Sequence, residues 1–311
     1  MKFGILGDAK IAREKLIPAI TKAGHEIVAI GRRNPDKPSD HPLYQGMAQL
    51  SYDDMLAMAD IDAIYNPLPN HLHASWSRKA MQAGKHVLCE KPMILSEAEL
   101  DELEQTSHKT GQIIYEAIMV RHHPQWHWLR NLDLGDVHHV HAHFSYPPQP
   151  DGNIRNYADM GGGPVWDIGC YTLLAGMMAF GTRPELQNAH LEMEDHLDVE
   201  KTGTATIDFG QGRILQMSAS SAMGLSQFVH VIGSKGWARL DVPFNAPPQA
   251  TARSMIGGIG EGRLVTFDEC DQYELMVRDF AAHCQTGTSP YLDDSRDLVR
   301  ILGAIVKMRN A

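Results

Sequence analysis

The stretch Lys2-Phe3-Gly4-Ile5-Leu6-Gly7-Asp8-Ala9-Lys10-Ile11-Ala12 sets the expected architecture of the chain. Its first five residues are an apolar run typical of a buried strand, and the apolar spacing over residues 11–23 predicts a helix directly afterwards. The turn between them has the spacing G-x-G-x-x-G/A, with alanine at the second and third small positions. Small residues there let backbone N–H groups approach a pyrophosphate at a helix N-terminus. We therefore predict a dinucleotide-binding turn at Gly7, Ala9, Lys10 and Ile11; the alternative is a strand–helix turn without a ligand.

Short apolar runs alternate with helical patterns over the first 120 residues. Further strands are expected at residues 26–30, 62–65, 85–89 and 112–117, and helices at residues 74–83 and 96–109. Ser96 and Glu99 form a capping-box signature at the start of the last helix. This alternation indicates a parallel sheet covered by helices on both faces. We expect residues 1–120 to form a doubly wound α/β domain of the Rossmann type.

The pattern changes after residue 120. Strands are expected in succession at residues 137–146, 201–209, 213–220, 227–232 and 237–242, with glycine-containing turns inside the last two pairs. Strands that follow one another without helices indicate an antiparallel sheet. Helices are expected at residues 272–284 and 294–308, and loops at residues 147–150 and 246–262. We expect residues 121–311 to form an α+β domain on a mostly antiparallel, open-faced sheet.

Composition excludes several classes of protein. The chain has 311 residues, of which 43% are hydrophobic and 21% charged, which excludes a disordered chain. Its net charge of −10 disfavours a nucleic-acid partner. The four cysteines form no CxxC pair, and we find neither a secretory signal nor an apolar run long enough for a membrane span. We therefore expect a cytoplasmic protein without membrane contact.

Histidines alternate along one predicted strand, at His139, His141 and His143. Three imidazoles on one face of a strand could hold a metal ion, but no cysteine or carboxylate cluster accompanies them in the sequence. Polar alternation on a half-exposed sheet explains the pattern better. We expect no metal site.

The end of the second predicted strand bears on the choice of cofactor. Gly31-Arg32-Arg33-Asn34 follows it, and no acidic residue occurs before Asp36. An acid at this place holds the ribose 2′-hydroxyl of NAD, whereas a cation suits the 2′-phosphate of NADP. Arginine is well matched to phosphate because its donors form a planar fork. Arg32 and Arg33 therefore favour NADP, with NAD and a solvated loop as the alternatives.

Two segments carry a family resemblance. Residues 65–73 are Tyr-Asn-Pro-Leu-Pro-Asn-His-Leu-His, and residues 83–92 are Ala-Gly-Lys-His-Val-Leu-Cys-Glu-Lys-Pro. Lys91 thus follows a predicted parallel strand, at the edge of the sheet where ligands bind in such folds. The second segment resembles the A-G-K-H-V-x-x-E-K-P hallmark of the glucose–fructose oxidoreductase / inositol dehydrogenase / MocA family. The resemblance implies cofactor contacts from Pro67, Asn70, His73, Glu90 and Lys91.

The second domain strengthens the resemblance. Residues 161–171 are Gly-Gly-Gly-Pro-Val-Trp-Asp-Ile-Gly-Cys-Tyr, similar to the glycine-rich turn and D-x-x-x-[H/Y] motif of the same family. By this resemblance Lys91, Tyr171 and Asp167 are the catalytic residues, and Arg121 and Arg155 join the last two near the substrate. Tyrosine in place of histidine resembles the subgroup of dihydrodiol dehydrogenases and NADP-dependent xylose dehydrogenases. Asp8, Met119 and residues 164–166 depart from the family pattern.

The chemistry gives a reason for these residue types. When an alcohol loses a hydride its O–H proton must also leave, and a tyrosine can take that proton if a nearby cation stabilises the phenolate. We assign Tyr171 this role and Lys91 the role of its electrostatic partner, with the exchanged assignment left open. If a helix starts near Asp167, that residue and Tyr171 lie one turn apart on one face.

Each residue also has a structural interpretation. Lys91 could be a solvated loop residue, Tyr171 a core aromatic, Asp167 a helix cap and Arg155 an ion-pair partner.

The sequence predicts an NADP-preferring oxidoreductase that transfers a hydride between nicotinamide and a hydroxyl or carbonyl carbon of a sugar-like or diol substrate. Two alternatives come from the same resemblance. One is a catalytically silent NADP-binding regulator, and the other is a glycosidase that uses NAD. The resemblance also implies a homodimer or higher oligomer formed through the open face of the second sheet.

Overall fold

The computed structural model describes residues 1–181 and 183–310, apart from the side chain of residue 310. Contacts group residues 1–119 with 271–295 in a first unit, and residues 120–270 with residues 296 onward in a second. The expected division after residue 120 places residues 271–295 in the second domain, but the structure groups them with the first. The reason is packing: Phe280 of α8 (Gln272–Thr286) lies with its ring centroid 6.0 Å from Phe3 and 5.7 Å from Tyr115.

The first unit is built on a six-stranded parallel sheet. Its strand order is β3-β2-β1-β4-β5-β6, the order of a dinucleotide-binding fold, and the predicted doubly wound sheet is confirmed. The order reverses between β1 and β4, where such sheets bind their ligands at the carboxyl ends of the strands. The strands are β1 (Lys2–Leu6), β2 (Glu26–Arg32), β3 (Ala48–Ser51), β4 (Ala63–Asn66), β5 (His86–Glu90) and β6 (Ile114–Ala117).

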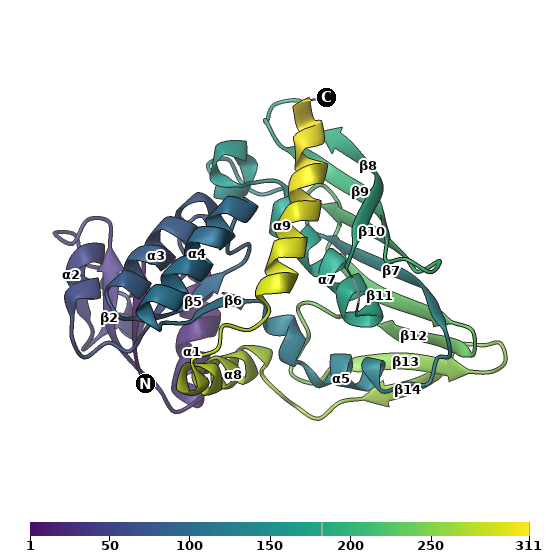
Figure 1. Cartoon of the computed structure of the whole chain (residues 1–311), viewed down its shortest axis with the longest axis horizontal. Coiled ribbons are helices and arrows are strands. Elements are labelled where there is room, and N and C mark those ends of the chain that lie inside the picture. The colour runs from purple at the N-terminus through teal and green to yellow at the C-terminus, as the bar shows by residue number, and fades with distance from the viewer. Residues whose placement is uncertain (182, 311) are drawn as a thin grey trace. The chain divides into compact units, whose positions relative to one another are not determined.

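Helices connect these strands. The capping box predicted at α4 is present, because Ser96 Oγ accepts from the N–H of Glu99 and the Glu99 side chain accepts from the N–H of Ser96. α3 and α4 pack side by side (Figure 1). β3 and α2 were not predicted, since β3 is a four-residue strand with every residue only half-buried. The connecting helices are the π-helical η1 (Ala12–Leu16), α1 (Ile17–Lys22), α2 (Tyr52–Ala57), η3 (Asn70–Leu72), α3 (His73–Gln82) and α4 (Glu97–Thr110).

The second unit contains an eight-stranded sheet of order β14-β13-β12-β11-β7-β10-β9-β8. Among the strands in the described part of the chain, only β7 and β10 of this sheet pair in parallel, so the predicted, mostly antiparallel sheet is confirmed. Its strands are β7 (Val137–Ser145), β8 (Glu185–Met193), β9 (Glu200–Asp208), β10 (Ile214–Ser220), β11 (Ser226–Gly233), β12 (Gly236–Leu240), β13 (Thr251–Ile256) and β14 (Arg263–Thr266). The expected loop over residues 246–262 was wrong in part, because β13 forms there by pairing along the whole of β12.

One face of this sheet is covered by α7 (Gly169–Phe180), which packs against β7 and β10 (Figure 1). Ten of its twelve residues are buried, as expected for a helix that is apolar on all sides. The opposite face of the strands carries polar side chains such as Thr204 and Gln216, which are exposed. Two helices cross the division between the units: η4 (Met119–His122) begins at the boundary, and the first turn of α9 (Leu292–Val306) belongs to the first unit. The other helices of the second unit are α5 (Pro124–Arg130), η5 (Ile154–Asn156), η6 (Ala158–Met160), α6 (Pro164–Asp167) and η7 (Lys307–Asn310). Among the described residues, we find no helix with the length and apolar content required to cross a membrane.

Candidate functional site

The turn after β1 is a tight turn built on Gly7. Gly7 has φ +85° and donates its N–H to the carbonyl of Gly31 at 2.8 Å. A Cβ at Gly7 would lie 3.2 Å from a methyl carbon of Leu68, so both conformation and space favour glycine. Ala9, Lys10 and Ile11 lead from this turn into η1, and the exposed Lys10 pairs with Glu14 at 3.7 Å.

Arg32 ends β2 beside this turn. Its side chain is only 17% exposed, and Nε and Nη1 are buried without a hydrogen-bond partner in the part of the chain that the structure describes. Buried donors of this kind normally have a partner, which here would be a ligand oxygen. The neighbouring Arg33 is exposed. The residues at this strand end therefore fit the 2′-phosphate of NADP.

Asp8 is held by three groups of the first unit. Its carboxylate accepts from the hydroxyl of Tyr44 at 2.5 Å, forms a close ion pair with Arg13, and lies 3.6 Å from Nη1 of Arg32. Burial raises the pKa of Tyr44 to about 12, and its hydrogen bond to Asp8 adds to the shift. The negative charge that departs from the family pattern is therefore balanced within the protein, and two cations, Arg32 and Arg33, stay beside the turn.

Lys91 follows β5, at the same edge of the sheet as Gly7. Glu90 precedes it and accepts a hydrogen bond from the hydroxyl of the buried Tyr65 at 2.7 Å, and burial raises the pKa of Tyr65 well above its usual value. The pKa of Tyr273 is also raised, mainly by burial, while the charge of the nearby Lys91 lowers it. Lys91 is half-buried, and its backbone N–H donates to Glu90 at 3.3 Å. The residue before Lys91 is thus held by a buried tyrosine.

His73 joins the two loops that follow β4 and β5. Nε2 lies 2.5 Å from the carbonyl of Leu68, and Nδ1 lies 2.7 Å from the carbonyl of Pro92. Burial lowers the pKa of His73 to about 4, whereas its contacts to the carbonyls of Pro92 and Leu68 act in the opposite direction. Its nitrogens thus contact the protein backbone, whereas Pro67 and Asn70 on the same loop are half-buried.

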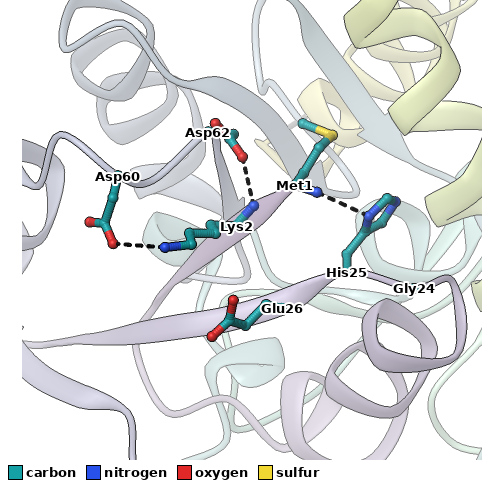
Figure 2. A pocket seen from close by; sticks show the side chains of 7 residues that line it. All are labelled: Met1, Lys2, Gly24, His25, Glu26, Asp60 and Asp62. Atoms are coloured by element: carbon teal, nitrogen blue, oxygen red, sulfur yellow. Dashed lines mark hydrogen bonds and ion pairs between the residues drawn. The ribbon is translucent and has the colours of Figure 1, made fainter.

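A hollow at the opposite edge of this sheet has a structural explanation. Figure 2 shows the polar contacts among its lining residues. The Met1 ammonium lies 3.2 Å from Nδ1 of His25, the Lys2 ammonium pairs with Asp60 at 3.3 Å, and the backbone N–H of Lys2 donates to Asp62 at 2.7 Å. Lys2 and Glu26 begin β1 and β2, so the hollow lies at the amino ends of the strands. Ligands of open parallel sheets bind at the carboxyl ends.

In the second unit, the carboxylate of Asp167 accepts hydrogen bonds from two polar side chains. Its Oδ2 accepts from Nε of Arg155 at 2.6 Å and from the hydroxyl of Tyr146 at 2.8 Å. The Asp167 side chain is 12% exposed and that of Arg155 is 43% exposed, so the cluster opens on the arginine side. The charge of Asp167, more than any other group, raises the pKa of Arg155. Tyr146 was not predicted; its only signal is a polar aromatic at the end of a predicted strand.

Tyr171 lies in the first turns of α7. Its ring stacks on Phe244 with centroids 5.6 Å apart and lies 5.9 Å from the ring of Phe144. The charge of Tyr171 is the smallest of the contributions that raise the pKa of Arg155. The expected helical turn from Asp167 to Tyr171 was wrong: α6 ends at Asp167, Ile168 has φ −125°, and α7 begins at Gly169.

The remaining predicted residues lie on other elements. Arg121 belongs to η4, whereas Arg155 lies on η5 and Asp167 is the last residue of α6. On β7, His143 hydrogen-bonds Ser218 and Ser145, and His139 stacks on His141 with centroids 5.8 Å apart. Among the described residues, no group of three potential metal ligands has the arrangement that an ion needs.

Comparison with known proteins identifies the family. Residues 1–118 match the family described as "Oxidoreductase family, NAD-binding Rossmann fold", and residues 127–239 match the GFO/IDH/MocA C-terminal domain. The chain belongs to the GFO/IDH/MocA family. The resemblance inferred from the E-K-P segment and the glycine-rich turn is therefore confirmed.

Three relatives of this family member are informative. D-xylose 1-dehydrogenase (NADP(+)) 2 of Haloferax volcanii is 33% identical, with 98% of this chain and 96% of that protein covered. The dTDP-3,4-didehydro-2,6-dideoxy-alpha-D-glucose 3-reductase of Actinomadura kijaniata is 30% identical, with 98% and 94% covered. The crystal structure of KijD10, a 3-ketoreductase from Actinomadura kijaniata in complex with NADP and TDP-benzene, matches with a TM-score of 0.92 at 29% identity, covering 98% of this chain and 96% of that one.

Proposed function

We propose that this protein is an NADP-preferring oxidoreductase that interconverts a hydroxyl and a carbonyl on a sugar-like substrate. The observation that carries the proposal is the pair of buried, unbonded donors on Arg32 beside the Gly7 turn, in a sheet of dinucleotide-binding order. The relatives support it, because one is an NADP-dependent xylose dehydrogenase and another reduces a keto-sugar nucleotide.

The chain supplies binding and proton transfer, whereas bound NADP supplies the hydride acceptor or donor. Gly7 and the start of η1 hold the pyrophosphate, and Arg32 with Arg33 holds the 2′-phosphate. Pro67, Asn70, Glu90 and Lys91 come from the loops after β4 and β5, at the ligand-binding edge of the sheet. His73 keeps those two loops together through the carbonyls of Leu68 and Pro92.

The proton is handled by Tyr171 and Lys91. Tyr171 gives a proton to, or takes it from, the substrate oxygen, and Lys91 stabilises the phenolate form. Within the second unit the charge of Arg155 favours the same form. Asp167 fixes Arg155 and Tyr146, and these polar groups with Arg121 bind substrate hydroxyls. Structures of KijD10 with a tyrosine changed to Phe, and with a lysine changed to Ala, concern the same two residue types.

The proposal includes a cytoplasmic location and a homodimer or higher oligomer formed through the open face of the second sheet. Sedimentation analysis of the purified protein tests the oligomer.

A turnover screen tests the function. NADPH absorbance is followed with aldoses, polyols, dihydrodiols and keto-sugar nucleotides in both directions, with NAD in parallel. Tyr171→Phe should abolish most turnover, whereas the control Tyr157→Phe, at a tyrosine that is 40% exposed, should not. NADP binding without turnover on every substrate would favour the silent regulator. Release of a sugar without net change in NADPH would favour the glycosidase.

A further inference from the structure

A buried ion pair lies behind the glycine turn of the second unit. Nε of Arg309 on η7 donates to Oε2 of Glu200 on β9 at 2.5 Å, and the two side chains are only 7% and 0% exposed. Nη2 of Arg309 also donates to the carbonyl of Gly162 at 2.7 Å. Oε1 of Glu200 accepts from the N–H of Val165 at 2.9 Å. The pair is therefore bonded to the backbone on both sides of Gly163.

The turn is shaped to admit this pair. Gly163 has φ +95°, and a Cβ there would lie 2.3 Å from Nη2 of Arg309 and 2.6 Å from Oε1 of Glu200. A Cβ at Gly162 would lie 2.6 Å from the carbonyl oxygen of Arg155. The glycines thus allow the backbone to approach the ion pair on one side and the Arg155 segment on the other.

The same backbone carries the substrate-binding cluster. The N–H of Gly163 donates to the carbonyl of Arg155 at 2.8 Å, and the N–H of Asp167 donates to the carbonyl of Gly163 at 3.0 Å. Asp167 and Arg155 are in turn joined by their 2.6 Å ion pair. An uninterrupted series of hydrogen bonds therefore runs from Arg309 through the turn to Asp167.

A buried ion pair is a weak source of stability, because desolvation of the two charges offsets much of their attraction. Its bonds here are directed at the backbone of one turn, and that turn sets where Asp167 and Arg155 meet. We propose that Arg309 and Glu200 are positioning residues that fix the Asp167–Arg155 pair for substrate. The inference rests on the proposed function, since it concerns the substrate half of that site.

Two variants separate positioning from stability. Arg309→Met leaves the Glu200 charge buried and alone, and lowers both the melting temperature and kcat/KM. The double variant Arg309→Met with Glu200→Gln removes both charges and recovers most of the melting temperature. Its kcat/KM for the substrate stays about 10- to 100-fold low, because a small misplacement of binding groups is costly. The dissociation constant for NADPH, which binds the first unit, changes by less than about two-fold.

Arg300→Met is the matched control. Arg300 on α9 pairs with Asp297 at 2.8 Å and donates to the carbonyl of Pro184, so its loss lowers stability without touching the turn. It should leave kcat/KM unchanged. Recovery of wild-type kcat/KM by the double variant would overturn the inference, as would an equal loss in Arg300→Met.

Amide hydrogen exchange gives a readout that needs no substrate. The amides of Gly163 and Asp167 should exchange faster in the double variant and at the wild-type rate in Arg300→Met. Unchanged protection of both amides in the double variant refutes the positioning role. Because this readout is independent of turnover, an inactive substrate panel would count against the proposed function alone.

Discussion

Replacing Arg32 by methionine should weaken the binding of NADP selectively. Methionine keeps an unbranched apolar stem of similar reach but removes the guanidinium. The only charged group facing that guanidinium within 4 Å in the described residues is Asp8, at 3.6 Å from Nη1. Asp8 keeps its bonds to Arg13 and Tyr44, so the turn itself should hold its shape.

The magnitude follows from the two unbonded donors of Arg32. A hydrogen bond to a charged group contributes about 1.5–3 kcal/mol. The opposing charge of Asp8 reduces the net attraction for phosphate, so we take about 2 kcal/mol in total, which is about 30-fold in the dissociation constant. NAD has no 2′-phosphate, and its affinity should change by less than about two-fold.

Fluorescence titration of NADPH and NADH against the wild type and the variant measures both constants. Arg78→Met is the matched control, since that arginine lies on α3 with its side chain 46% exposed and only a 3.8 Å pair to Glu102. It should bind both dinucleotides as the wild type does. Equal losses for NADPH and NADH, or no loss for NADPH, would refute the assignment of Arg32 to the 2′-phosphate.

Three further perturbations test other parts of the site. Asp8→Asn keeps a hydrogen-bond acceptor but removes the negative charge near Arg32. We expect the binding free energy of NADPH to improve by about 1 kcal/mol, which is about five-fold in the dissociation constant. Weaker binding in the same titration would contradict this. The pKa of His73 is lowered to about 4 by burial, so the unfolded state binds more protons between about pH 6.5 and 4 and stability falls as the pH falls through that range. Urea unfolding at several pH values should show a shallower fall in His73→Gln, and an unaltered slope excludes this residue as a cause. Gly163→Ala should lower the free energy of unfolding by more than about 3 kcal/mol, because a Cβ there meets the Arg309–Glu200 pair. Gly152→Ala should lower it by about 1 kcal/mol, because Gly152 has a similar φ of +81° but nothing within 4 Å of its Cβ. Equal losses would show that the backbone angle alone causes the destabilisation.

The sequence was sufficient for elements with a strong periodic pattern. β1 was predicted with its observed bounds, because its four residues after Lys2 are all buried and so all apolar or glycine. β8 was missed, since its residues are exposed or half-buried and Glu185 and Asn188 break any apolar alternation. β13 was missed for a different reason: proline and glycine residues flank it, and pairing with β12 outweighs its weak local preference.

The break between α6 and α7 had no local signal. Asp167 and Tyr171 have the spacing of one helical turn, but the amide of Ile168 bonds the carbonyl of Pro164 and the chain then leaves helical geometry. The position of α6 depends on a tertiary contact, because the N–H of Val165 at its start is bonded to Glu200, more than thirty residues later in the chain. A spacing argument cannot include a partner that the fold alone brings near.

The residues of the site therefore divide by how they can be found. Those proposed to touch ligand, such as Lys91 and Arg32, come directly after predicted parallel strands, so a strand pattern and a short motif locate them together. Those that hold the ligand-binding groups in place come from distant segments: Tyr44 bonds Asp8 across 36 positions, and Arg309 bonds Glu200 across 109. Each supporting residue is a buried polar group, and the hydrogen bonds to its partners in the fold compensate the free-energy cost of burying it. Substitutions at these positions should therefore alter the geometry of the site while every recognisable motif stays intact.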